Sequence, residues 1–210
     1  MNTFLFATNN LHKLNEIRSM AGSRFVVWGL KDVHFTGEIP EKELTLEGNA
    51  MGKARYLYHR MILNHSVQHL ITGIFADDTG LEVEALHGAP GVFSARYSGD
   101  HFPSEQERSA SNVRKLLQEM KDTRNRKARF RTVIAYISKE EEKLFEGIVN
   151  GHIIETPRGN NGFGYDPVFV PEGYTKTFAE MTEEEKNSIS HRAKAFQQFL
   201  SYLYDKILLP

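Results

Sequence analysis

The segment from residue 162 to residue 192 concentrates glycines, aromatic rings and polar side chains. The residues of interest in it are Phe163, Gly164, Tyr165, Asp166, Lys186, His191 and Arg192. Glycines let a backbone approach a ligand closely, aromatic rings offer flat faces for a base, and lysine, histidine and arginine donate hydrogen bonds to phosphate or carbonyl oxygens. This set of residues suits a nucleotide. Taken as a lone pair, His191 and Arg192 are more simply interpreted as surface residues at the start of a helix.

Two adjacent carboxylates, Asp77 and Asp78, follow an apolar run that predicts a short buried strand over residues 71–76. A strand that delivers carboxylates to its end can hold a divalent metal through oxygen ligands. Adjacent side chains on a strand point to opposite faces, so only one of the pair is expected to reach a given metal. For the two aspartates alone an aspartate-rich turn is the favoured alternative, because Thr79 and Gly80 follow them.

The first twenty residues predict a strand, a loop and a helix. Phe4 to Ala7 is apolar, Thr8-Asn9-Asn10 interrupts it, and apolar residues recur at helical spacing from Leu11, with Asn9 or Asn10 as the cap. A helix that starts in this way presents free backbone N–H groups toward an anion. Lys13 lies in the first turn, where it opposes the helix dipole, and a phosphate facing it would explain its placement. A solvated surface lysine is the alternative.

Composition agrees with a soluble enzyme of modest size. The chain has 210 residues, which is enough for one substantial core and allows two lobes around a cleft. It carries 26 Lys and Arg against 27 Asp and Glu, so no global basic field attracts nucleic acid or anionic lipid. No apolar stretch is long enough to span a bilayer, and the first residues lack a cleavable signal pattern. Zero cysteines exclude disulfides and thiolate metal sites and weakly favour the cytoplasm.

The remaining elements alternate between strands and helices, without repeats or an internal linker. Helices are expected over 46–63, from Pro103 at its first position through Met120, and from about Ser190 with one apolar face. Strands are expected over 25–28, 71–76, 81–83, 129–138, 143–154 and 167–170, with a charged turn at 139–142 joining two of them. Residues 30–44 read as an acidic connection, and residues 87–99 as a loop rich in glycine and proline.

With these segments laid out, the chain resembles the Ham1 family of inosine triphosphate pyrophosphatases. The matching segments follow the family's order and spacing over nearly the whole chain. They are Ala7-Thr8-Asn9-Asn10 with Lys13 and Glu16, Glu47-Gly48-Asn49-Ala50 with Lys53-Ala54, Asp77 to Leu81, Ala89 to Val92, Ser94 to Tyr97, and the segment ending at Arg192. Most family members have serine where Thr79 stands, and because the hydroxyl is retained we expect its role to be kept.

The resemblance implies a fold, an activity and a partner. The fold would be a single α/β domain over residues 1–210, two-lobed, with a long central mixed sheet and a nucleotide-binding groove between the lobes. The activity would be Mg²⁺-dependent hydrolysis of non-canonical purine nucleoside triphosphates (ITP, dITP and XTP) to the monophosphate and pyrophosphate. That reaction cleanses the nucleotide pool of deaminated purines before they enter DNA or RNA. The resemblance also implies a cytoplasmic homodimer without nucleic-acid or membrane partners.

The resemblance also assigns roles to residues. Glu41 and Asp78 would hold Mg²⁺, Asp78 would also accept the proton of the attacking water, and Asp77 would assist. Phosphate contacts would come from Thr8, Asn9, Asn10, Lys13, Lys53 and Thr79. Base recognition would fall to Phe163, Gly164, Tyr165, Asp166, Lys186, His191 and Arg192. Without the family, Glu41 and Lys53 would both be interpreted as solvated surface residues.

Three other classes of function stay open at the level of sequence. A pyrophosphatase of the Maf type would act on modified or pyrimidine nucleotides, but the segment from 162 to 192 favours purines. A non-catalytic nucleotide-binding protein would keep the base pocket with a disabled metal site, against which Glu41, Asp77 and Asp78 argue. A structural module has the least support, because glycines and charges cluster at ligand-like positions.

Overall fold

The computed structural model describes residues 2–62, 70–99 and 101–208, and the chain divides into two compact units. Unit 1 consists of Met1–Asp78, Val133–Glu146 and Ala193–Pro210. Unit 2 consists of Thr79–Thr132 and Gly147–Arg192. The prediction of a single domain over the whole chain stays a prediction. Among the described residues, no helix has the length and apolar character needed to cross a membrane.

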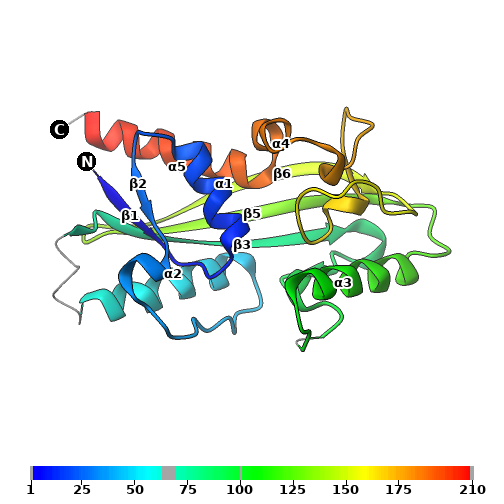
Figure 1. The fold of residues 1–210 in the computed structure, drawn as a ribbon, viewed down its shortest axis with the longest axis horizontal. Coiled ribbons are helices and arrows are strands. Elements are labelled where there is room, and N and C mark those ends of the chain that lie inside the picture. The colour runs from blue at the N-terminus through cyan, green and yellow to red at the C-terminus, as the bar shows by residue number, and fades with distance from the viewer. Residues whose placement is uncertain (1, 63–69, 100, 209–210) are drawn as a thin grey trace. The chain divides into compact units, whose positions relative to one another are not determined.

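The strands form one mixed sheet in the order β2-β1-β3-β5-β6-β7, and β4 pairs with β3 (Figure 1). Their bounds are β1 Thr3–Phe6, β2 Val26–Trp28, β3 Gly73–Val83, β4 Pro90–Gly91, β5 Lys127–Ile137, β6 Glu142–Ile153 and β7 Phe169–Pro171. Strand β1 is parallel to both β2 and β3, whereas β4 and β7 are antiparallel to β3 and β6. The predicted α/β class with a mixed sheet is confirmed. The nucleotide groove that the resemblance implies stays a prediction.

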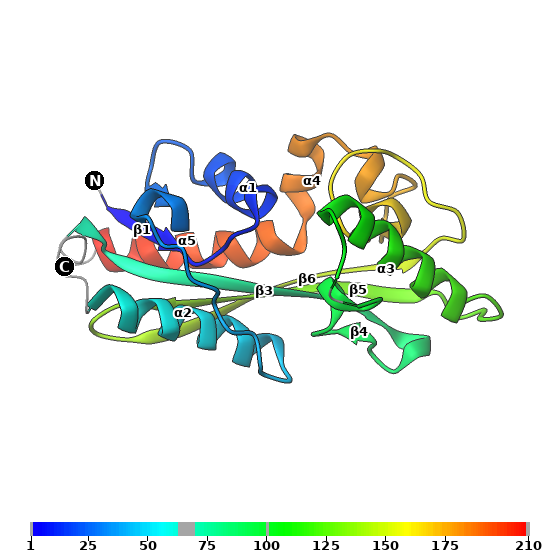
Figure 2. The same ribbon diagram turned by 60° about the horizontal axis from the view of Figure 1, so that its bottom comes forward.

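Three helices surround the strands of unit 1. They are α1 Leu11–Ala21, α2 Leu46–Ile62 and α5 His191–Leu208, of which all but the first two residues of α5 belong to this unit. Figure 2 shows α1 and α5 on one side of the strands and α2 on the other. The apolar stripe of α5, with Phe196 and Phe199, packs on Phe4 and Phe75, as its spacing predicted. Asn10 caps α1 as predicted, since its side chain accepts a hydrogen bond from the backbone of Lys13.

Unit 2 has its own hydrophobic core. Helix α3 Glu105–Glu119 contributes Val113 and Leu116, which lie in the same core as Phe130, Phe169 and Phe178. Helix α4 Glu183–Ile189, which the sequence did not predict, begins at the capping pair Thr182 and Glu185. Short 3-10 helices are η1 Leu30–Val33, η3 Glu84–Leu86, η4 Ser94–Arg96, η5 Asp166–Val168 and η6 Phe178–Glu180.

Three predicted boundaries are wrong for identifiable reasons. Helix α3 is capped by Ser104, whose hydroxyl accepts from the backbone of Glu107, so Pro103 precedes the cap instead of opening the helix. The strand predicted over 167–170 is η5 followed by β7. The predicted break at Asp77 to Gly80 is absent, because β3 runs without interruption from Gly73 to Val83. Of the helix predicted over 46–63, residue 63 lies outside the described residues.

Gly80 serves close packing instead of a turn. A Cβ at this position would lie 2.6 Å from the carbonyl oxygen of Gly91, on the neighbouring strand β4. We therefore expect Gly80→Ala to lower the free energy of unfolding by about 1–3 kcal/mol, because the strands must separate to admit the methyl group. Gly52→Ala is the control, since a Cβ there meets no atom within 4 Å and should stabilise helix α2 by about 0.5–1 kcal/mol. Urea denaturation of both variants tests this, and equal midpoints would contradict it.

Candidate active site

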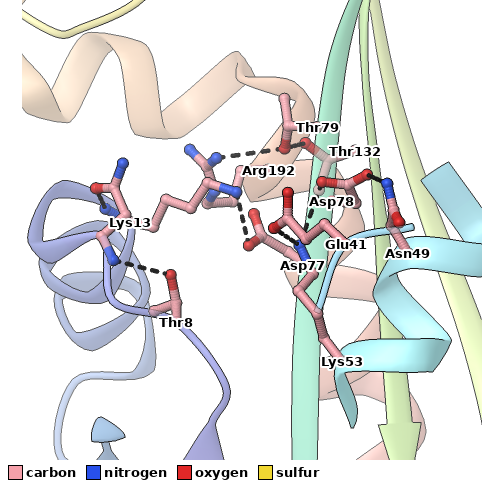
Figure 3. Close-up of polar contacts among 11 residues, drawn as sticks. Thr8, Lys13, Glu41, Asn49, Lys53, Asp77, Asp78, Thr79, Thr132 and Arg192 are labelled. Atoms are coloured by element: carbon pink, nitrogen blue, oxygen red, sulfur yellow. Dashed lines mark hydrogen bonds and ion pairs between the residues drawn. The ribbon is translucent and has the colours of Figure 1, made fainter. Parts of the chain in front are cut away.

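Strand β3 presents Asp77 and Asp78 to opposite faces of the sheet (Figure 3). The carboxylate of Asp77 forms an ion pair with Lys13 Nζ at 2.9 Å. The carboxylate of Asp78 instead contacts Lys53 Nζ at 3.2 Å and Asn49 Nδ2 at 3.1 Å. Both aspartates are buried. The prediction that the two side chains face apart is confirmed, while the turn that was favoured for this dipeptide is wrong.

Four residues of unit 1 form a group that we call the carboxylate cluster: Glu41, Asn49, Lys53 and Asp78. Lys53 Nζ donates to Glu41 Oε1 at 2.9 Å and to Asp78 Oδ1 at 3.2 Å, so the two carboxylates converge on one cation. Lys53 is only 5% exposed, which rules out the surface interpretation of this lysine. Glu41 lies in a segment without regular structure, whereas Asn49 and Lys53 lie one turn apart on α2.

In the carboxylate cluster, burial and neighbouring charges shift the pKa values of Lys53 and Asp78 in opposite directions. Burial alone would lower the pKa of the Lys53 ammonium, but Asp78, Glu41 and Asp77 together raise that pKa above its ordinary value. Burial raises the pKa of the Asp78 carboxyl above its ordinary value, although the neighbouring ammonium groups of Lys53 and Lys13 act against this shift. The fold therefore holds Asp78 where a negative charge is costly and compensates it with cations.

The donor set of the cluster suits Mg²⁺ better than a metal that needs a cage of protein ligands. Within the residues that the structure describes, no three His, Cys, Asp or Glu side chains are grouped to hold a metal ion. Mg²⁺ commonly binds one or two carboxylates and takes its remaining ligands from water and substrate phosphates. Glu41 and Asp78 already face one positive charge, so they are the two residues that would hold such an ion.

The loop before α1 is ordered by its own side chains. Thr8 Oγ1 accepts a hydrogen bond from the backbone of Asn10 at 3.1 Å, and Asn10 caps the helix, while Asn9 is exposed. Lys13, in the first turn, is directed to Asp77, and 16% of its side chain is exposed. The interpretation of Lys13 as a solvated surface lysine is therefore wrong. This part of unit 1 combines a helix N-terminus with a fixed ammonium group, which suits an anion.

Thr79, the residue after Asp78, belongs to a polar contact in unit 2. Its hydroxyl lies 2.7 Å from the hydroxyl of Thr132 and accepts a hydrogen bond from Arg192 Nη2 at 3.4 Å (Figure 3). Arg192 is 1% exposed and Thr132 is fully buried. The interpretation of Arg192 as a surface residue is wrong, because its guanidinium group is held inside the unit.

A second group in unit 2, which we call the aromatic platform, consists of Phe163, Asp166, Lys186 and Arg192. Lys186 Nζ lies 4.9 Å and Arg192 Cζ 5.6 Å from the centre of the Phe163 ring. Asp166 Oδ2 accepts hydrogen bonds from the backbone of Phe163 and from Lys186 Nζ, both at 2.8 Å. Asp166 thus fixes the ring and the ammonium group relative to each other. The platform offers a flat face next to two cationic donors.

The other candidates for base recognition lie in different surroundings. Tyr165 is buried in the core of unit 2, and its hydroxyl donates to the carbonyl oxygen of Ser94 at 2.9 Å. His191 is 3% exposed and its ring stacks on Phe130 at 4.6 Å, so its surface interpretation is also wrong. Gly164 has a φ of 64°, which suits glycine and shapes the chain after Phe163.

Sequence reasoning assigned no role to two buried polar residues that contact these side chains, although each left a signal. Thr132 shares the buried face of β5 with Phe130 and Ile134, where an apolar residue is expected. Asn49 lies on the inward stripe of α2 beside Ala50, where a polar side chain is equally unusual. A polar residue at a position of the apolar repeat is therefore a usable indicator of a buried polar site.

Comparison with known proteins identifies the family to which the chain belongs. Residues 4–202 match the Ham1 family. A dITP/XTP pyrophosphatase of Porphyromonas gingivalis is 49% identical over 204 residues, covering 97% of this chain and 98% of that protein. Solved structures of Ham1 proteins from Coxiella burnetii and Staphylococcus aureus are each 33% identical, cover 98% of this chain and 100% of their own, and give TM-scores of 0.80 and 0.79. The chain belongs to the Ham1 family.

Proposed function

We propose that this protein hydrolyses non-canonical purine nucleoside triphosphates, namely ITP, dITP and XTP, to the nucleoside monophosphate and pyrophosphate with the help of Mg²⁺. The observation that carries the proposal is that the carboxylates of the buried Asp78 and of the loop residue Glu41 both contact the ammonium group of Lys53. The aromatic platform adds a surface suited to a purine. The relatives named dITP/XTP pyrophosphatase support this choice of substrates.

The chemistry at phosphorus requires neutralised charge and a positioned water. A water oxygen bonds to the innermost phosphorus, and the bond from that phosphorus to the oxygen bridging to the next phosphate breaks, so pyrophosphate leaves. Asp78 accepts the proton of the water, while Lys13 and Lys53 offset the charge of the phosphates. Thr8, Asn9, Asn10 and Thr79 contribute polar groups to the phosphates. Glu41 and Asp78 would hold Mg²⁺, which would supply further positive charge to offset the phosphates.

Discrimination between bases follows from the donors of the aromatic platform. Hypoxanthine and xanthine carry a carbonyl oxygen at position 6, where adenine carries an amino group. A guanidinium or ammonium group has only N–H donors, so Arg192 and Lys186 can bond to the carbonyl oxygen but not to the amino group. Phe163 offers an aromatic ring to the base, and Lys186 Nζ and Arg192 Cζ lie 4.9 Å and 5.6 Å from the centre of that ring. Adenine offers no acceptor at position 6 to the N–H groups of these two side chains, which disfavours ATP.

Pyrophosphate release from a panel of triphosphates tests the proposal. With Mg²⁺ present we expect release from ITP, dITP and XTP and little from ATP or dTTP. EDTA should abolish the reaction, and added Mg²⁺ should restore it. Preference for pyrimidine or otherwise modified nucleotides would favour the Maf-type alternative. Binding of ITP without pyrophosphate release from any nucleotide would overturn the proposed activity and favour the non-catalytic alternative.

Three further features complete the proposal. Family membership is consistent with a homodimer, a cytoplasmic location and a single functional domain. Light scattering after size-exclusion chromatography tests the dimer, since a mass near one chain would overturn it. Fractionation of the source cells tests the location.

A further inference from the structure

Asn49 makes two hydrogen bonds, one within the carboxylate cluster and one to the segment that carries Glu41. Its Nδ2 donates to Asp78 Oδ2 at 3.1 Å (Figure 3), and its Oδ1 accepts from the backbone N–H of Glu43 at 3.0 Å. The side chain is 1% exposed, so both of its polar ends lie away from water. Asn49 therefore links strand β3 to the segment that carries Glu41, two residues before Glu43.

The segment around Glu41 depends on such contacts because it has no regular structure of its own. Residues 38–43 belong to neither a helix nor a strand, and the Glu41 side chain is 37% exposed. The segment lies close to the first turn of α2, where a Cβ on Gly48 would come within 2.7 Å of Glu43 Cβ. Because Gly48 has no side chain, the segment can pack closely against the first turn of α2. The hydrogen bond from the backbone N–H of Glu43 to Asn49 then holds the segment in that place.

The same asparagine sets the direction of the Asp78 carboxylate. Asp78 Oδ2 receives the amide hydrogen of Asn49, which leaves Oδ1 directed to Lys53 Nζ, the cation that Glu41 also contacts. A carboxylate held by one oxygen in this way cannot rotate freely, so the orientation of its other oxygen is fixed. The amide of Asn49 thus acts on both acidic residues, on one directly and on the other through the backbone.

We propose that Asn49 is a positioning residue that holds Glu41 and Asp78 facing one divalent cation. The inference rests on the proposed function, which identifies that cation as Mg²⁺. A merely structural asparagine would affect the free energy of unfolding and leave cation affinity unchanged. A positioning residue changes cation affinity beyond any loss of stability, because the two acidic ligands no longer converge.

The test compares Asn49→Ala with the matched control Asn112→Ala. Asn112 is also buried on a helix and bonds by its amide to the loop that holds Ser98 and Ala95, but it belongs to unit 2. Binding of Mn²⁺, a paramagnetic substitute for Mg²⁺, is measured by electron paramagnetic resonance without nucleotide. We expect Asn49→Ala to weaken Mn²⁺ binding by about ten- to a hundredfold, the usual cost of removing an outer-shell partner. Asn112→Ala should bind Mn²⁺ like the unmodified protein.

Kinetics give a second readout. Asn49→Ala should need a correspondingly higher Mg²⁺ concentration for half-maximal pyrophosphate release, with the KM for ITP unchanged once Mg²⁺ saturates. Asn49→Ser serves if the alanine variant fails to fold, because a hydroxyl keeps the site polar but is too short to reach both partners. It should weaken Mn²⁺ binding in the same direction.

The outcomes separate this inference from the proposed function. If the unmodified protein releases pyrophosphate from ITP but the Asn49 variants bind Mn²⁺ as tightly as it does, the positioning role is overturned and the enzyme stands. If no nucleotide is hydrolysed, the proposed function fails, while a weaker Mn²⁺ affinity confined to the Asn49 variants still supports the role. Failure of the unmodified protein to bind Mn²⁺ overturns the role as well.

Discussion

Replacing Asp78 by asparagine is expected to lower the rate of pyrophosphate release by about 10²–10⁴-fold, the range that loss of a general base produces. The substitution keeps the shape of the side chain and removes its charge. It thereby removes the proposed proton acceptor and one of the two carboxylates that converge on Lys53 Nζ. Steady-state release of pyrophosphate from ITP at saturating Mg²⁺ measures the effect. Substantial retained activity would refute the role of Asp78.

The same variant should remain folded. Because burial raises the pKa of Asp78, the folded state favours the neutral carboxyl, and at neutral pH the charged form costs stability. A neutral amide avoids that cost, but it also removes one of the two carboxylates that pair with the buried Lys53. Because the two effects oppose each other, thermal denaturation in EDTA should give a cooperative transition with a midpoint close to that of the unmodified protein.

Asp77→Asn is the matched comparison for Asp78→Asn. It alters the neighbouring carboxylate, which faces Lys13 on the opposite side of β3, and it leaves the contacts of the carboxylate cluster in place. We therefore expect a smaller fall in rate than for Asp78→Asn. An equal or larger fall would assign the main catalytic role to Asp77 instead.

Periodicity predicted the helices of unit 1 well because burial on one face leaves a local signal. The stripe on α5 predicted its core contacts, and the asparagine before Leu11 predicted the start of α1. The segment Asp77 to Gly80 was misinterpreted because turn propensity is local, whereas β3 is held by pairing with β1 and β4. The need for glycine at position 80 comes from Gly91, which no pattern near Gly80 reveals.

The candidate site was predictable residue by residue only through family resemblance. Its contacts join Lys13 to Asp77 across 64 positions, and Arg192 to Thr79 across 113 positions, so spacing alone cannot reveal them. Resemblance in turn carries residue types and not geometry. It did not indicate that Lys13 pairs with Asp77 while Lys53 pairs with Asp78, nor that Asn49 links the acidic residues.

Arg192 provides the strongest test of base recognition. Its guanidinium group lies near the ring of Phe163 and donates to Thr79, and the residue is almost fully buried. Hydrogen bonds to a charged group contribute about 1.5–3 kcal/mol, so Arg192→Ala should lower kcat/KM for ITP by roughly ten- to a hundredfold. ATP makes no such bond, so its kcat/KM should change little and the ratio of ITP to ATP should fall. Arg192→Lys should restore the ratio only in part, because an ammonium group lacks the planar fork of guanidinium.

A control is needed because removing a buried arginine also leaves a cavity. Arg126 holds unit 2 together through hydrogen bonds to the carbonyl oxygens of Met120, Ile153 and Ile154, and its guanidinium group is directed to these backbone atoms. Arg126→Ala should therefore lower the thermal midpoint while keeping the ratio of ITP to ATP. If Arg192→Ala also leaves that ratio unchanged, discrimination at position 6 must reside in other donors, of which Lys186 is the next to test because it lies over the same ring.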